Sequence, residues 1–188
     1  MQNNYKDDLL LVIDMQNVYN KGQKWECRNT KGAAENIKKI IEVLPKQNVI
    51  FTEYIADTKN ARGVWKDYNI KYKDVNNDEY ANLMVNELKE IAGEYPVYSK
   101  SVYSSLAVPQ VLEACKKAKR VIVTGVVAEC CVLSTVMALI DQGIYTLYIT
   151  DAVSGLDEPK EKATELILSG LCPLHVNMLT TRDYLNLA

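Results

Sequence analysis

Short apolar runs rich in β-branched residues alternate with amphipathic stretches along the whole chain. The apolar runs predict strands at residues 9–13, 48–52, 96–99, 120–124, 145–150 and 174–179. The stretches between them predict helices at residues 31–43, 79–91, 108–117, 131–142 and 158–169. Strands that alternate with helices of this length are typical of βαβ units, in which helices cover both faces of a parallel sheet. We therefore expect a single domain over residues 1–188 with a three-layer α/β/α, Rossmann-like fold and a mainly parallel six-stranded sheet.

Two features refine this pattern. Gly143 and Gly170 follow the last two predicted helices, where a residue in the left-handed conformation often ends a helix. Residues 53–78 break the alternation, because they are polar and aromatic with little periodicity. A connection of this length is usually functional or disordered, and its aromatic residues argue against disorder. We expect it to cover a substrate; the alternative is a surface loop with its own small packing cluster.

Composition and charge exclude several classes of protein. Hydrophobic residues make up 48% of the 188 residues and charged residues 24%, as in ordinary globular proteins. The net charge of −2, with both signs mixed along the chain, provides no basic face for nucleic acid. No apolar run approaches the roughly 18 residues of a membrane span, and the polar start lacks the apolar stretch of a secretion signal. We expect a cytoplasmic protein without a nucleic-acid or membrane partner.

The cysteines and the single histidine limit the possible chemistry. Five cysteines in a chain without a secretion signal favour reduced thiols over a disulfide framework. No pair of them has the spacing of a zinc site. His175 is the only histidine, which argues against a histidine-rich metal site and against a cysteine paired with a nearby histidine. No metal or other cofactor is expected.

Three reactive residues stand at or just beyond strand-like runs: Asp14, Lys100 and Cys131. The carboxyl ends of parallel strands form one crevice, where ligands bind in folds of this class. A carboxylate, an ammonium and a thiol in that crevice are the parts of a cysteine nucleophile with its own base and cation. Each residue also has a simpler interpretation: Asp14 as a cap, Lys100 as a solvated lysine, and Cys131 as a buried apolar residue.

Cys131 opens a helical pattern directly after a strand and a turn that contains Gly125. A thiol in the first turn of a helix faces unpaired backbone N–H groups, which stabilise a thiolate and could also hold an oxyanion. The neighbouring Cys130 points about 100° away on a helix, so only one of the two can be the nucleophile. Asp14 follows five apolar residues, and a partly desolvated carboxylate can accept a thiol proton.

Three motifs together resemble the isochorismatase-like cysteine hydrolases, a superfamily that includes nicotinamidases, N-carbamoylsarcosine amidohydrolases and isochorismatase. The motifs are LVIDMQN at residues 11–17, SKSVYSSL at 99–106 and TGVVAECCVLST at 124–135, with a looser match of YITDA at 148–152. Their order, spacing and strand context agree over nearly the whole chain.

The resemblance implies a role for each motif residue. Asp14 matches the general base of the family, Lys100 its triad lysine, and Cys131, rather than Cys130, its nucleophile. A cis peptide would join Val126 and Val127, so that the N–H groups of Val127 and Cys131 form the oxyanion hole. The implied reaction is thiolate attack on an amide-type carbonyl followed by hydrolysis of a thioester. Family members are commonly dimers or tetramers, so the resemblance also implies a homo-oligomer.

Two departures from the family pattern narrow the range of expected substrates. Nicotinamidases place metal-binding Asp and His residues after the second strand, but residues 51–57 here contain no histidine. Nicotinamidase activity and a metal are therefore not expected. Family members that hydrolyse the vinyl ether of isochorismate can lack the cysteine, so its presence here favours amide or carbamoyl chemistry.

The substrate-facing residues are predicted less directly. Trp65 and Tyr103 could wall a planar small-molecule substrate, or they could serve only packing and loop anchoring. Arg62 and Lys66 flank Trp65 and could meet a carboxylate, or they could simply be solvated. Gln16 and Asn17 are expected to hold the loop around Asp14.

We expect a metal-independent cysteine hydrolase that cleaves a C–N bond in a small amide, ureido or carbamoyl compound. Two alternatives remain open. One is a vinyl-ether hydrolase of the isochorismatase type, which would depend on Asp14 rather than Cys131. The other is a catalytically silent member that binds a small molecule or a protein.

Overall fold

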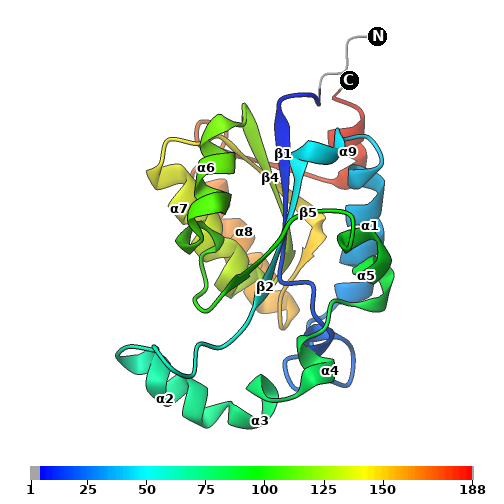
Figure 1. Ribbon diagram of the computed structural model, residues 1–188. Coiled ribbons are helices and arrows are strands. Elements are labelled where there is room, and N and C mark those ends of the chain that lie inside the picture. Colours follow the sequence, from blue (N-terminus) through cyan, green and yellow to red (C-terminus); the bar gives the residue numbers. More distant parts are fainter. Residues whose placement is uncertain (1–4, 188) are drawn as a thin grey trace.

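The computed structural model describes residues 5–187 and contains one parallel six-stranded sheet of the predicted type (Figure 1). The strands are β1 (Asp8–Ile13), β2 (Val49–Tyr54), β3 (Val97–Lys100), β4 (Arg120–Val126), β5 (Thr146–Ser154) and β6 (Val176–Leu179). Their order in the sheet is β3-β2-β1-β4-β5-β6, and every pairing is parallel. The order reverses at β1, so the crevice for a ligand is expected beside the end of that strand.

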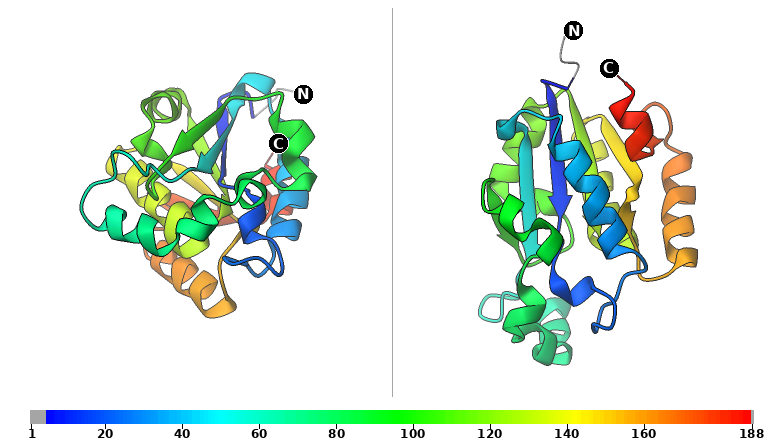
Figure 2. Two further views of the ribbon diagram at one scale, coloured as in Figure 1. Left: turned by 60° about the horizontal axis from the view of Figure 1, so that its bottom comes forward. Right: turned by 90° about the vertical axis from the view of Figure 1, so that its right-hand side faces the viewer.

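Helices cover both faces of the sheet, and further helices lie beyond the carboxyl ends of its strands (Figures 1 and 2). The helices are α1 (Thr30–Ile41), α2 (Val64–Lys71), α3 (Lys73–Asn76), α4 (Glu79–Asn82), α5 (Asn86–Ala92), α6 (Pro109–Lys117), α7 (Leu133–Asp141), α8 (Glu158–Ser169) and α9 (Thr181–Leu185). Single turns are η1 (Asn17–Tyr19), η2 (Lys46–Asn48), η3 (Ser105–Ala107) and η4 (Ala128–Val132). Helices α1, α5 and α9 lie on one face and α6, α7 and α8 on the other, which confirms the three layers.

Alternate residues of β1 face the two helix layers. Leu10 and Val12 pack with Ile37 of α1 on one face, whereas Leu9 and Leu11 pack on the other face with side chains from α6 and α7. All six residues of β1 are buried. Apart from Asp8, which is paired with Arg120, the central strand is apolar, as expected for a strand covered on both faces.

Helices α2, α3 and α4 lie beyond the carboxyl ends of the strands (Figures 1 and 2). The connection over residues 53–78, in which little periodicity was visible, thus contains two short helices. The prediction of one continuous helix at residues 79–91 is wrong, because the chain is extended between α4 and α5. There Val85 N–H donates to Met15 C=O, and Met84 pairs with Gln16 in an antiparallel bridge. These contacts with the loop after β1 override the local helical pattern.

The two predicted helix caps differ. Gly143 has a φ of 70° and ends α7 as expected. The prediction for Gly170 is wrong, since its φ is −68°. After α8 the chain continues in right-handed turns, with Leu171 N–H bonded to Leu168 C=O, so no left-handed residue is required. No helix among residues 5–187 is long and apolar enough to cross a membrane.

Gly125 allows β4 to approach the end of β1. Its φ is 105°, and a Cβ atom at this position would lie 2.1 Å from the Ile13 carbonyl oxygen. A backbone oxygen cannot move aside as the end of a flexible side chain can. The glycine therefore sets the spacing of the two strands directly before Asp14.

We expect Gly125→Ala to lower the free energy of unfolding by more than about 2 kcal/mol, because it adds a backbone clash to the strain of a positive φ. Gly143→Ala is the matched control, since it has a positive φ but no atom within 4 Å of the added Cβ. It should cost about 1–2 kcal/mol. Urea unfolding of both variants measures the difference, and equal losses would contradict the role of the close approach.

Candidate active site

Asp14 directly follows β1 and is fully buried. Its φ of 51° places it in the left-handed region, which an aspartate tolerates better than most residues. The backbone N–H donates to Thr52 C=O at 3.0 Å, and the Thr52 hydroxyl donates to Oδ1 at 2.9 Å. The unusual backbone conformation thus turns the carboxylate toward the neighbouring strand ends.

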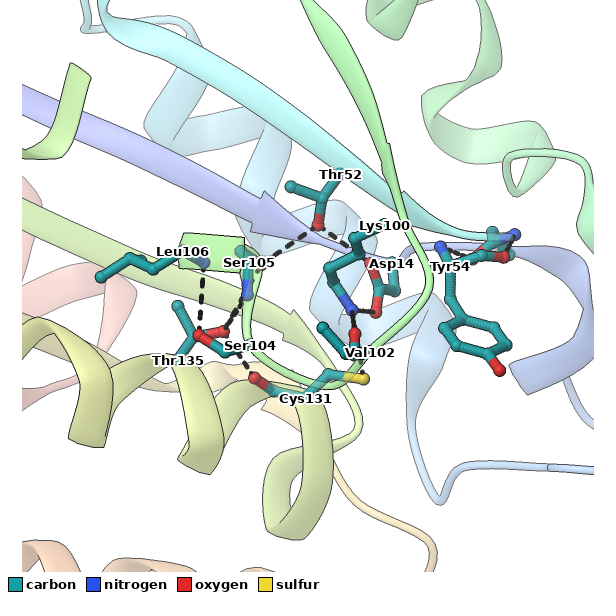
Figure 3. Close-up of polar contacts among 11 residues, drawn as sticks. Asp14, Thr52, Tyr54, Lys100, Val102, Ser104, Ser105, Leu106, Cys131 and Thr135 are labelled. Atoms are coloured by element: carbon teal, nitrogen blue, oxygen red, sulfur yellow. Dashed lines mark hydrogen bonds and ion pairs between the residues drawn. The ribbon is translucent and has the colours of Figure 1, made fainter. Parts of the chain in front are cut away.

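Lys100 ends β3, and its side chain is fully buried. The ammonium Nζ donates to Asp14 Oδ2 at 2.6 Å, to Val102 C=O at 3.0 Å and to Cys131 Sγ at 3.5 Å (Figure 3). These three contacts use all three hydrogens of the ammonium. Burial is the largest single influence and acts to lower the pKa of Lys100, but the charges and hydrogen bonds of Asp14 and Cys131 together outweigh it, and the pKa is raised. The lysine is therefore a cation at neutral pH.

Cys131 lies in η4, a single π-helical turn between β4 and α7. The turn is closed by hydrogen bonds from Cys130 N–H at 3.0 Å and Val132 N–H at 3.1 Å to Val127 C=O. The Cys131 side chain packs in the apolar cluster beneath α6 and α7, whereas Cys130 packs against the cluster on the α1 face. The structure therefore brings Cys131, rather than Cys130, to Lys100.

The resting form of Cys131 is the thiol. Burial raises its pKa well above the usual value, and the nearby Asp14 raises it further, while Lys100 opposes the rise. Stabilisation of a thiolate by the backbone N–H groups of the turn stays a prediction. Asp14 is the carboxylate beside the thiol.

A chain of hydroxyl groups connects the carboxylate to the turn that carries the thiol. Thr52 Oγ1, which donates to Asp14, lies 3.4 Å from Ser105 Oγ. Thr135 Oγ1 lies 3.4 Å from Ser105 Oγ, accepts a hydrogen bond from Ser105 N–H and donates to Cys131 C=O at 2.7 Å. These hydroxyls fix the distance between β2, η3 and α7. Ser105 and Thr135 lie inside the sequence motifs and Thr52 lies outside them, but a single hydroxyl residue carries no pattern that would reveal its role.

The peptide bond between Val126 and Val127 is cis, as the resemblance implied. It lies at the end of β4, directly before η4. Whether the N–H groups of Val127 and Cys131 hold an oxyanion stays a prediction.

Trp65 and Tyr103 lie against each other, with ring centroids 5.0 Å apart and planes at 66°. Trp65 also packs on Tyr68, which in turn lies 4.7 Å from Tyr72. Trp25 joins the same group of rings from the loop before α1. The predicted wall residues are thus part of a larger aromatic cluster between α2 and the loop after β3.

The cations beside Trp65 lie toward the outside of this cluster. Arg62 and Trp65 line a cavity of about 210 Å³ together with Val102, whose carbonyl accepts from Lys100. Lys66 lines a neighbouring cavity of about 450 Å³ with Ile70. Arg62 and Lys66 are exposed, as the simpler interpretation expected.

Gln16 holds the loop around Asp14, as expected, and also fixes Tyr54 at the end of β2. Its Nε2 donates to Tyr54 C=O at 3.1 Å and to Asn82 C=O at 2.9 Å, and its Oε1 accepts from Tyr54 N–H at 2.8 Å. Asn17 donates to Tyr80 C=O. Tyr54 was not predicted from the sequence, because neither the missing histidine of residues 51–57 nor the aromatic character of residues 53–78 distinguishes it.

The residues after β2 do not fit the metal site of nicotinamidases. Asp57 caps its own loop, where Oδ1 accepts from Lys59 N–H and Asn60 N–H. Within residues 5–187, no group of three His, Cys, Asp or Glu side chains is arranged to hold a metal ion.

Comparison with known proteins agrees with this fold. Residues 8–181 match the model of the isochorismatase domain. No curated protein matches the sequence. The structure is similar to MAR1 ribonuclease from Caenorhabditis elegans (TM-score 0.71, 20% identity, 96% of this chain and 80% of the other).

Two hydrolases are also similar in structure. One is a cysteine hydrolase from Pseudomonas syringae pv. phaseolicola 1448A (TM-score 0.75, 17% identity, 95% of this chain and 90% of the other). The other is N-carbamoylsarcosine amidase from Thermoplasma acidophilum (TM-score 0.69, 18% identity, 93% and 96%). At these identities the structural matches show a shared fold, whereas the domain match spans nearly the whole chain. The chain therefore belongs to the isochorismatase-like family of hydrolases.

Proposed function

We propose that this protein is a metal-independent cysteine hydrolase that cleaves the C–N bond of a small amide, ureido or carbamoyl compound. One observation carries the proposal: a single buried ammonium, Lys100, lies 2.6 Å from the Asp14 carboxylate and 3.5 Å from the Cys131 sulfur. A nucleophile, a base and a fixed cation in mutual contact are what acyl transfer to a thiol requires.

In the first half-reaction, Asp14 takes the thiol proton as the Cys131 sulfur attacks the carbonyl carbon. Lys100 stays charged and stabilises the sulfur while its negative charge develops. The N–H groups of Val127 and Cys131 would hold the oxyanion of the tetrahedral intermediate. When the C–N bond breaks, the nitrogen takes the proton from Asp14 and leaves as ammonia or an amine, and a thioester remains.

In the second half-reaction, Asp14 accepts a proton from a water molecule that attacks the thioester. The C–S bond then breaks, and the proton returns to the sulfur. The site thus ends as it began, with a carboxylate, an ammonium and a thiol. Trp65 and Tyr103 are proposed to wall the substrate, since both belong to the aromatic cluster next to this site.

The lack of disulfide bonds between the cysteines is consistent with a reducing compartment. All five cysteines are unpaired, which fits the proposed cytoplasmic location. Assembly of the chain into a dimer or tetramer stays a prediction.

Release of ammonia or amine from a panel of small amides, ureido acids and carbamoyl compounds tests the proposal. We expect at least one substrate whose hydrolysis is insensitive to a chelator. Cys131→Ala should lower the rate by at least about four orders of magnitude, because the nucleophile is lost. Cys130→Ala is the matched control and should remain active, since that thiol packs on the other face.

The same panel separates the proposal from its two alternatives. A vinyl-ether hydrolase would keep its activity in Cys131→Ala and lose it in Asp14→Asn. A folded wild-type protein that hydrolyses no compound of the panel would contradict the amide chemistry and favour a silent binding protein.

Removing each charge beside Cys131 should shift its titration in opposite directions. Asp14 disfavours the thiolate, so Asp14→Asn should lower the pKa of Cys131, and its alkylation should begin at a lower pH. Lys100 favours the thiolate, so Lys100→Met should move the alkylation profile to higher pH. Hydrolysis should be lost in both variants.

The pH dependence of iodoacetamide alkylation, followed by mass spectrometry of the Cys131 peptide, measures both shifts. Circular dichroism checks that each variant is folded, since an unpaired buried charge costs about 3–5 kcal/mol. Shifts of the same sign in the two variants would be inconsistent with the proposed charge arrangement.

A further inference from the structure

Tyr54 has a buried hydroxyl group without a hydrogen-bond partner. The residue ends β2 and is 5% exposed, and its phenol oxygen is one of three buried side-chain oxygen or nitrogen atoms in residues 5–187 that lack a partner. Buried polar groups are nearly always hydrogen-bonded, because an unpaired one loses its contacts with water and gains nothing. The unpaired phenol therefore calls for an explanation.

The position of this side chain is fixed by its neighbours. Gln16 bonds both the N–H and the C=O of Tyr54, which fixes the backbone from which the ring extends. The ring packs edge-on against Trp25, with centroids 6.4 Å apart. The Lys100 ammonium lies 5.8 Å from the ring centroid on another side. The hydroxyl is thus held in place without a partner of its own.

The phenol borders the reacting groups. Lys100 contacts the Tyr54 ring and also lies 3.5 Å from the Cys131 sulfur, and Figure 3 shows the ring extending from the end of β2 beside them. Burial raises the pKa of Tyr54 to about 12, and the neighbouring Cys131, Tyr103 and Asp14 contribute to the rise. The group is therefore an uncharged phenol that can donate a hydrogen bond.

The charges around the thiol offer little to a charged substrate. The strongest charges that act on Cys131 are those of Asp14 and Lys100, which are opposite in sign and paired with each other. At the thiol itself, an added anion would therefore meet a cation that is already paired with Asp14, and the exposed Arg62 lies in the separate cavity that Trp65 and Val102 line. An uncharged substrate loses less on leaving water.

We infer that Tyr54 is a specificity-determining residue, whose hydroxyl donates a hydrogen bond to a neutral acceptor on the substrate. This rests on the proposed function and refines it. The substrate class is a small, uncharged amide or ureido compound that presents an acceptor oxygen or nitrogen to Tyr54.

Alkylation of Cys131 tests this without knowledge of the substrate. Iodoacetamide is a small neutral amide with an acceptor oxygen, allyl iodide is neutral but has no acceptor, and iodoacetate is an anion. The second-order rate constant of each reagent with Cys131 is measured at one fixed pH. It is divided by the rate constant of the same reagent with glutathione, which corrects for the different intrinsic reactivities of the reagents. The Cys130→Ala background makes the modified cysteine unambiguous in mass spectrometry.

Tyr54→Phe should slow the iodoacetamide reaction about five- to tenfold, as expected for one hydrogen bond, and leave the allyl iodide reaction unchanged. Tyr95→Phe is the matched control, because it removes a phenol that packs on Phe51. It should change neither rate. In the protein with Tyr54 intact, iodoacetate should react more slowly than iodoacetamide after normalisation.

Several outcomes would overturn the inference. Equal slowing of both neutral reagents in Tyr54→Phe would show that the residue acts through packing. An iodoacetamide rate that does not change in Tyr54→Phe would show that the hydrogen bond is absent. Iodoacetate that reacts as fast as iodoacetamide would overturn the preference for neutral compounds, as would a Cys131 that neither neutral reagent reaches. The proposed function fails on a separate result, namely normal alkylation of Cys131 in a protein that hydrolyses no amide.

Discussion

The buried contact between Lys100 and Asp14 is the interaction on which the site depends. Neither side chain reaches water, so each charge requires the other, and breaking such a pair costs about 3–5 kcal/mol. The pair joins the ends of β1 and β3, and the Thr52 hydroxyl adds the end of β2 to the same carboxylate. Three strand ends are thereby fixed around one ion pair, and the remaining hydrogens of the ammonium position Val102 and Cys131.

This arrangement explains how a reactive cysteine can be inert at rest. Burial keeps the proton on the sulfur, although a cation lies beside it. In the proposed reaction, Asp14 accepts this proton during attack, and the summed charge of the three groups is the same before and after that transfer. The sheet sets the distances between the groups, while burial favours the protonated thiol and the neighbouring acidic groups favour the protonated lysine.

The parts of this structure that the sequence predicted depend on local patterns. Alternating apolar runs indicated the sheet and its layers, and strand ends indicated Asp14, Lys100 and Cys131. The extended segment before α5 was missed because its hydrogen bonds come from Met15 and its neighbours, which are distant in sequence. Tyr54 was missed for a similar reason, since a hydroxyl without a partner becomes visible only when everything around it is placed.

Gln16 has a consequence for how this protein family can diversify. One side chain bonds Tyr54 at the start of the segment that contains α2 and α3, and Asn82 near its end. Gln16 thus holds the two ends of that segment close to each other and to Asp14. Lengthening a loop whose ends are already held together adds little entropic cost. Evolution can change the length and sequence of the intervening helices, and hence what enters the site, while the carboxylate stays in position.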